Sequence, residues 1–163
     1  MKTLSFRNSN LLYQNLTKDL SSKLEKSTNG LSIGLAGGSS LDLLYEKLVK
    51  KNIDWSKFTL TLIDERCVSI NDSFSNFGNL KRRFIDYVYP KPKTLQLYKV
   101  GTNLNDYLAK VENKLINNIL PFDIIVISIG NDGHVASIFP DLDDLTLENL
   151  IYEGSFGMLK SIK

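Results

Sequence analysis

One short segment carries the side chains best suited to proton transfer. His134, the only histidine of the chain, follows Asp132 and Gly133 just after a run of β-branched apolar residues at 124–129. An imidazole can act as a general base on water near neutral pH, and a carboxylate beside it fixes which ring nitrogen carries the proton. Although a lone histidine is more often structural, this pattern predicts a base at the carboxyl end of a buried strand, where open α/β sheets bind ligands.

A second segment suits the binding of an oxyanion. Gly37, Gly38, Ser39 and Ser40 lie between a predicted strand and a predicted helix. Glycines permit close approach of the backbone, serines add hydroxyls, and a helix start supplies free amides. The spacing fits neither a Walker A loop nor the G-x-G-x-x-G pattern, so it does not predict nucleotide binding. A tight turn with a helix cap explains the same residues without a ligand.

A third polar segment, Asp64-Glu65-Arg66, follows another predicted strand. A guanidinium can hold a phosphate through two parallel hydrogen bonds, and Asp64 can accept bonds from sugar hydroxyls or orient a catalytic partner. The alternative is a surface ion pair in a loop. One cysteine and one histidine cannot build a structural zinc site, so we expect no metal.

The elements that position these segments alternate along the chain. Apolar spacing predicts helices at about 12–24, 41–48, 77–87, 104–115 and 145–150, with a further helix start after His134. Strands are predicted at 2–6, 31–36, 58–63, 95–100 and 124–129. This alternation predicts an α/β fold with a mainly parallel sheet covered on both faces. No repeat or linker divides residues 1–163, so we expect a single domain.

Composition limits the partners. The chain has 20 basic and 18 acidic residues, a net charge of +2, and its one basic cluster, residues 81–83, is typical of a solvated helix surface. Nucleic-acid binding is therefore not expected. The apolar runs are too short to cross a bilayer, and the N-terminus lacks the pattern of a signal peptide. We expect a cytoplasmic protein without membrane contact.

In order along the chain, the three segments resemble the motifs of the 6-phosphogluconolactonase family, within the wider sugar-phosphate isomerase and deaminase group. They are residues 35–40 (LAGGSS), 64–68 (DERCV) with 75–78 (SNFG), and 130–140 (GNDGHVASIFP). The resemblance implies a three-layer, Rossmann-like α/β sandwich. It also implies hydrolysis of 6-phosphogluconolactone to 6-phosphogluconate in the pentose phosphate pathway, without metal or organic cofactor, by a monomer or homodimer.

We expect His134 to activate water, with Asp132 and Asp64 as the other catalytic residues. Amides of the 130–133 loop, or nearby donors, are expected to stabilise the oxyanion. The full set expected to bind substrate and phosphate is Gly37, Gly38, Ser39, Ser40, Arg66, Asn76, Gly130 and Gly133.

Two alternatives stay open. Glucosamine-6-phosphate deaminases carry a glutamate in a segment that resembles Gly-His-Ile-Ala-Phe-Asn-Glu-Pro, whereas residues 133–140 contain no acid, which favours the lactonase. A sugar-phosphate-binding module without catalysis is the second alternative. Family members usually continue for sixty or more residues with further phosphate-binding groups, and nothing after Pro140 matches them. We therefore expect either a domain that is incomplete at its C-terminus or a degenerate paralogue.

Overall fold

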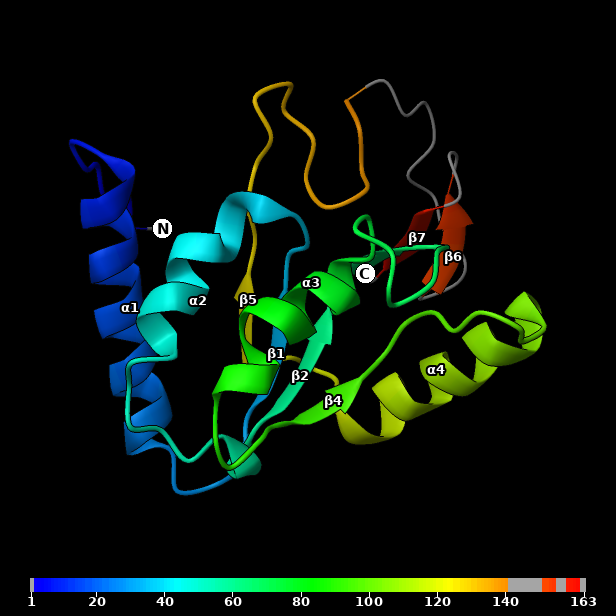
Figure 1. Cartoon of the computed structure of the whole chain (residues 1–163), viewed down its shortest axis with the longest axis horizontal. Coiled ribbons are helices and arrows are strands. Elements are labelled where there is room, and N and C mark those ends of the chain that lie inside the picture. The colour runs from blue at the N-terminus through cyan, green and yellow to red at the C-terminus, as the bar shows by residue number, and fades with distance from the viewer. Residues whose placement is uncertain (1, 141–150, 155–157, 162–163) are drawn as a thin grey trace.

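The centre of the molecule is a four-stranded parallel sheet. The computed structural model describes residues 2–140, 151–154 and 158–161 (Figure 1). The strands follow the order β4-β2-β1-β5, and each neighbouring pair is parallel. Their bounds are β1 (Ser32–Leu35), β2 (Thr59–Leu62), β4 (Lys93–Leu95) and β5 (Ile124–Val126).

Helices flank this sheet, with α1 and α2 on one side and α4 on the other (Figure 1). The α-helices are α1 (Ser9–Lys26), α2 (Asp42–Leu48), α3 (Asn76–Arg83) and α4 (Leu104–Asn118). Short 3₁₀ helices cover Ser39–Leu41, Trp55–Lys57 and Ile85–Tyr87. The predicted α/β class with a parallel sheet and flanking helices is confirmed.

A second, smaller sheet lies beside the first. It contains β3 (Asp64–Arg66), β6 (Ile151–Gly154) and β7 (Met158–Ser161) in the order β3-β7-β6, and both pairings are antiparallel. The sequence predicted a loop at residues 64–66, which is wrong. The error has a non-local cause, because β3 is a strand only through its pairing with β7, in which Asp64 pairs with Lys160 and Arg66 with Met158.

The core explains the central strands. All four residues of β1 are buried, and Leu60 and Leu62 of β2 are each 1% exposed. Leu44 of α2 and Leu115 of α4 are fully buried and pack within the same apolar cluster. Truncating a buried leucine of this kind to alanine costs roughly 2–5 kcal/mol, so these contacts fix the strands in place.

The register of the sheet brings the three polar segments to one edge. Leu35 pairs with Leu62 on one side and with Val126 on the other. Since the strands are parallel, the residues that follow these three positions leave the sheet at the same edge. The segments at 37–40, 64–66 and 130–134 therefore meet at this edge.

Several predicted elements differ from the structure. Residues 2–6 form no strand, and the strand predicted at 95–100 lies instead at Lys93–Leu95. The buried run at 124–129 is a strand only as far as Val126, and Ile125, Ile127 and Ile129 are 48, 52 and 73% exposed. Residues 135–140 form no helix, and two isolated β-bridges hold Val135 against Ile129 and Ile138. The helix predicted at 145–150 lies outside the described residues.

Candidate active site

The three polar segments enclose a small hollow of ≈ 210 Å³ at the carboxyl edge of the parallel sheet. Most of the residues predicted from the sequence line it together. The lining consists of Ala36, Gly37, Gly38, Ser39, Ser40, Asp64, Arg66, Ser128, Ile129, Gly130, His134 and Ala136. Asp132, Asn76 and Gly133 contact this lining from outside or continue its loops.

His134 is paired with Asp132 at the mouth of the hollow. The Nδ1 atom lies 2.5 Å from Asp132 Oδ1, and the backbone N–H of His134 donates to the same oxygen at 3.3 Å. These bonds to His134 hold the pKa of the Asp132 carboxyl below its usual range. A carboxylate at Nδ1 favours the tautomer with its proton there, which leaves Nε2 as a base. The arrangement can therefore take a proton from water.

The turn that carries His134 depends on two glycines. Gly133 has a φ of 87°, a left-handed conformation that favours glycine. A Cβ on Gly130 would lie 2.2 Å from His134 Cε1, so a larger residue would displace the imidazole. The amide of Gly130 donates to the His134 carbonyl at 2.8 Å, and that of Gly133 to the Gly130 carbonyl at 2.9 Å. Two of the four amides of the loop expected to stabilise an oxyanion therefore already have acceptors within the turn.

The glycine loop opposite is also held by side chains. The amide of Gly38 donates to Asn76 Oδ1 at 3.2 Å, and that of Gly37 to Asp64 Oδ1 at 3.4 Å. A Cβ on Gly37 would lie 2.1 Å from Asn76 Nδ2, so only glycine fits there. Asn76 therefore acts on the loop from behind the hollow, while Ser39 and Ser40 face it.

Asp64 and Arg66 both line the hollow. Asp64 is 4% exposed and accepts a hydrogen bond from the Ser137 hydroxyl at 2.9 Å. Within the described residues Arg66 forms no salt bridge, and its buried Nε has no hydrogen-bond partner. The surface ion pair between Arg66 and Asp64 is therefore not what this part of the structure shows. A buried guanidinium N–H without an acceptor suits an anionic ligand.

Sequence reasoning missed Ser137. Its side chain is 1% exposed and joins the 130–140 loop to Asp64, 73 positions earlier in the chain. Ala136, just before it, has a φ of 53°, which is uncommon for a residue other than glycine and turns the chain at this point. A serine in a loop gives no local signal for such a contact.

Phe139 takes the place where the resembling deaminase segment has its glutamate. Its ring lies 5.2 Å from the His134 ring, centroid to centroid. An aromatic ring cannot transfer a proton, so the histidine has a stacking partner there instead of a second acid. The described residues contain no group of three His, Cys, Asp or Glu side chains that could hold a metal ion.

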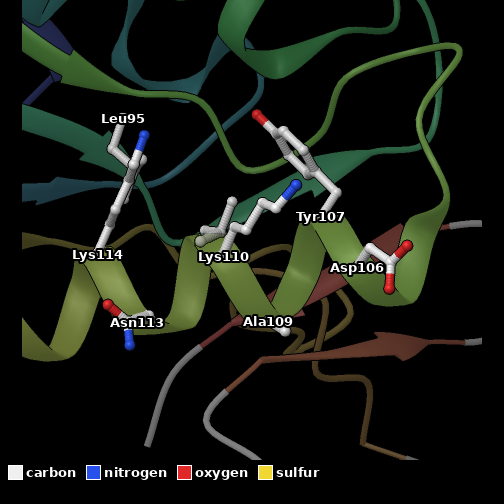
Figure 2. Close-up of a pocket in the computed structure, with 8 residues that line it drawn as sticks. Leu95, Asp106, Tyr107, Ala109, Lys110, Asn113 and Lys114 are labelled. Carbon is white, nitrogen blue, oxygen red and sulfur yellow. The ribbon is translucent and has the colours of Figure 1, made fainter.

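A larger hollow lies against α4 (Figure 2). It has a volume of ≈ 630 Å³, and Tyr107, Lys110 and Lys114 line it together with Leu95 of β4. None of the residues predicted to do chemistry reaches it. Size alone therefore does not locate the candidate site, whereas the convergence of the polar segments does.

Residues 7–152 match the family described as glucosamine-6-phosphate isomerases/6-phosphogluconolactonase. The chain belongs to this family. A 6-phosphogluconolactonase of Pseudomonas putida is 37% identical over 106 residues, which cover 65% of this chain and 43% of the relative. The corresponding protein of Borreliella burgdorferi is 33% identical over 119 residues, covering 67% and 48%. The chain thus spans about half the length of the curated relatives it matches.

Solved members of the family share the fold. The structure of a 6-phosphogluconolactonase from Shewanella baltica superposes with a TM-score of 0.80 at 26% identity, covering 96% of this chain and 72% of that one. A monomeric glucosamine-6-phosphate deaminase also superposes, with a TM-score of 0.73 at 20% identity, covering 83% and 58%. The fold therefore does not distinguish a lactonase from a deaminase. No helix among the described residues is long and apolar enough to cross a membrane.

Proposed function

We propose that this chain carries the water-activating and anion-binding site of a 6-phosphogluconolactonase, which hydrolyses 6-phosphogluconolactone to 6-phosphogluconate. The observation that supports this most strongly is His134, held through Nδ1 by Asp132 at the mouth of the hollow that Arg66 also lines. Ester hydrolysis needs one base and a site for the substrate's anion, and this hollow offers candidates for both.

The proposed reaction uses His134 twice. Nε2 takes a proton from a water molecule, and the resulting hydroxide forms a bond to the lactone carbonyl carbon. The carbonyl oxygen then carries the negative charge of a tetrahedral intermediate. When this intermediate collapses, the bond to the ring oxygen breaks, and the imidazolium returns its proton to that oxygen. Collapse gives an open-chain carboxylic acid with a new hydroxyl and regenerates the base, and the acid then loses its remaining proton to solvent to become the carboxylate.

Binding is assigned to the other walls of the hollow. Arg66 and the hydroxyls of Ser39 and Ser40 hold the phosphate, and Asp64 accepts from sugar hydroxyls while Ser137 keeps its carboxylate in place. Oxyanion stabilisation by the loop at 130–133 stays part of the proposal. Because Gly130 and Gly133 donate their amides within the turn, the donor would have to be another group of this loop or a rearranged one.

The direct test is a lactone hydrolysis assay, in which either the release of protons or the consumption of the ester is measured. The same preparation is offered glucosamine 6-phosphate, and ammonia is measured. Ester hydrolysis without ammonia release supports the lactonase, whereas the reverse result supports a deaminase-like enzyme. If neither substrate turns over but 6-phosphogluconate binds in calorimetry, a sugar-phosphate-binding module without catalysis is the better description.

We also propose that turnover by this single α/β domain requires additional residues, which its longer relatives contain. The curated relatives extend to about twice the matched length, and the apolar side chains of Ile125 in β5 and of Ile127 and Ile129 just after it are exposed. A fusion to the C-terminal segment of a full-length relative should raise turnover and reduce self-association. Equal activity with and without the added segment would contradict this. A cytoplasmic location and a monomeric or homodimeric state complete the proposal.

A further inference from the structure

A buried carboxylate beside the hollow has no role in the reaction proposed above. Glu65 lies on β3 between Asp64 and Arg66, yet it is only 2% exposed and does not line the hollow. Burial raises its pKa, and the hydrogen bonds that it accepts oppose that shift. A carboxylate that is removed from water needs such partners to persist.

The partners of Glu65 are concentrated at the start of α3. Oε1 accepts from the amides of Arg66 and Asn76, each at 2.7 Å. Oε2 accepts from the amide of Phe77 at 2.8 Å and from the hydroxyl of Ser75 at 3.3 Å. The first amides of a helix have no partner within the helix, so an acceptor must come from elsewhere. Glu65 supplies it and fixes where α3 begins relative to β3.

The start of α3 in turn holds the glycine loop. The side chain of Asn76 accepts from the amide of Gly38 at 3.2 Å through Oδ1. It donates to the carbonyl of Asp64 at 3.2 Å through Nδ2. Gly38 has a φ of 80°, and Gly37 leaves no room for a Cβ against Asn76. The position of the loop backbone therefore depends on the position of the Asn76 side chain. The position of Asn76 depends in turn on the hydrogen bonds of Glu65.

We propose that Glu65 is a positioning residue that sets the anion-binding geometry of the Gly37 to Ser40 loop by anchoring the first turn of α3 and, through it, the Asn76 side chain. It touches no ligand itself. The proposal rests on the proposed function only in taking this loop as the anion site. The hydrogen bonds from Glu65 through Asn76 to Gly38 stand whatever the substrate is.

The test compares three variants of the ¹⁵N-labelled chain at neutral pH. Glu65→Gln keeps the size of the side chain but places an NH₂ group against backbone N–H donors. Asn76→Ala keeps Glu65 and removes the last contact to Gly38. Asn103→Ala is the matched control, because Asn103 caps α4 in a similar way by accepting from the Asp106 amide at 3.2 Å, and it does not line the hollow.

Two readings are taken for each variant: the amide resonances of Gly37 and Gly38, and the affinity for inorganic phosphate and 6-phosphogluconate. Glu65→Gln and Asn76→Ala should both move the Gly38 resonance and weaken both anions about tenfold, the effect of misplacing one hydrogen bond to a charged group. Asn103→Ala should lower stability and leave both readings as in the original chain.

The proposal fails if Glu65→Gln lowers stability but leaves the Gly38 resonance and anion affinity unchanged, because Glu65 would then only cap α3. If Glu65→Gln does not fold, Asn76→Ala decides: unchanged Gly38 resonance and affinity would overturn the proposal, and the expected changes would support it. Failure of the proposed function looks different. In that case 6-phosphogluconate would not bind the original chain, while the Gly38 resonance would still respond to both substitutions.

Discussion

The two walls of the hollow are built in different ways. The inner wall, which we define as Gly37, Gly38 and Asp64 of the lining together with Glu65 and Asn76 behind them, joins two strands and a helix through side-chain hydrogen bonds. Its three polar side chains are almost fully buried. The outer wall, residues 128–140, carries Asp132 and His134, whose side chains are 60 and 37% exposed, and its bonds lie mostly within its own turn. Substitutions in the outer wall should therefore change chemistry with little effect on stability.

The largest expected effect is on the outer wall. His134→Ala should lower lactone hydrolysis on the order of 100-fold or more, because a positioned base contributes about that much. It is measured with the chain fused to the C-terminal segment of a full-length relative. Since His134 is partly exposed, the free energy of unfolding should change by no more than an ordinary surface substitution changes it, about 0.5 kcal/mol.

A fusion protein that keeps near-original turnover after His134→Ala would show that another group activates water. Large loss of stability would instead show that the imidazole holds the outer wall together. Phe139→Ala provides a useful partner, because it removes only the ring that lies beside the imidazole. It should reduce turnover far less than His134→Ala does.

Arg66→Lys separates phosphate binding from structure on the inner side. We expect phosphorylated ligands to bind about tenfold more weakly, since an ammonium cannot reproduce the two parallel hydrogen bonds of a guanidinium. An unphosphorylated lactone should be affected much less. Competition experiments with 6-phosphogluconate and the corresponding unphosphorylated acid measure the contrast. Equal losses for both ligands would assign Arg66 a structural role.

Asp132→Asn should have a smaller effect than His134→Ala. Hydrogen bonds from His134 hold the pKa of Asp132 below its usual range, so this carboxylate is ionised at neutral pH. Replacing it with an amide weakens the preference for one tautomer, but water can take its place at this exposed position. We expect turnover to fall about tenfold, in line with the loss of one charge-assisted hydrogen bond. A loss of turnover as large as that of His134→Ala would contradict the expected ranking of the two substitutions.

The sequence was sufficient to predict the parts of the fold that depend on local pattern. Leucines at helical spacing located α1, α2 and α4, and short apolar runs located β1 and β2, since both strands are buried against the same core. The run at 124–129 is still richer in apolar β-branched residues, yet one face of it is exposed. A hydrophobic run indicates the capacity to be buried, but it does not show whether another element covers both faces.

For the site, sequence predicted the reactive groups but not the contacts that hold them. His134, Asp64 and Arg66 follow strand ends, which topology brings together, so their meeting could be predicted. Glu65 lies between two predicted site residues, and Ser137 lies within the 130–140 segment. Their roles depend on partners 10 to 12 positions away for Glu65 and 73 positions away for Ser137. Whether a carboxylate faces a ligand or a helix start is decided by tertiary packing, and no local spacing reports it.

The smallest expected effect concerns how the inner wall responds to pH. In the folded chain, burial raises the pKa of Glu65 above its ordinary value of 4.5. An acid with a raised folded-state pKa binds its proton more tightly when folded, so its contribution to stability is present below the unfolded value and is lost as pH rises through the folded value. The stability of the original chain relative to Glu65→Gln should therefore decline as pH rises from 4.5 toward neutrality. Urea unfolding of both proteins across this range measures the difference, in which other titrating groups largely cancel. A difference that stays constant with pH, or grows as pH rises, would mean that the hydrogen bonds from α3 outweigh the cost of burying the charge.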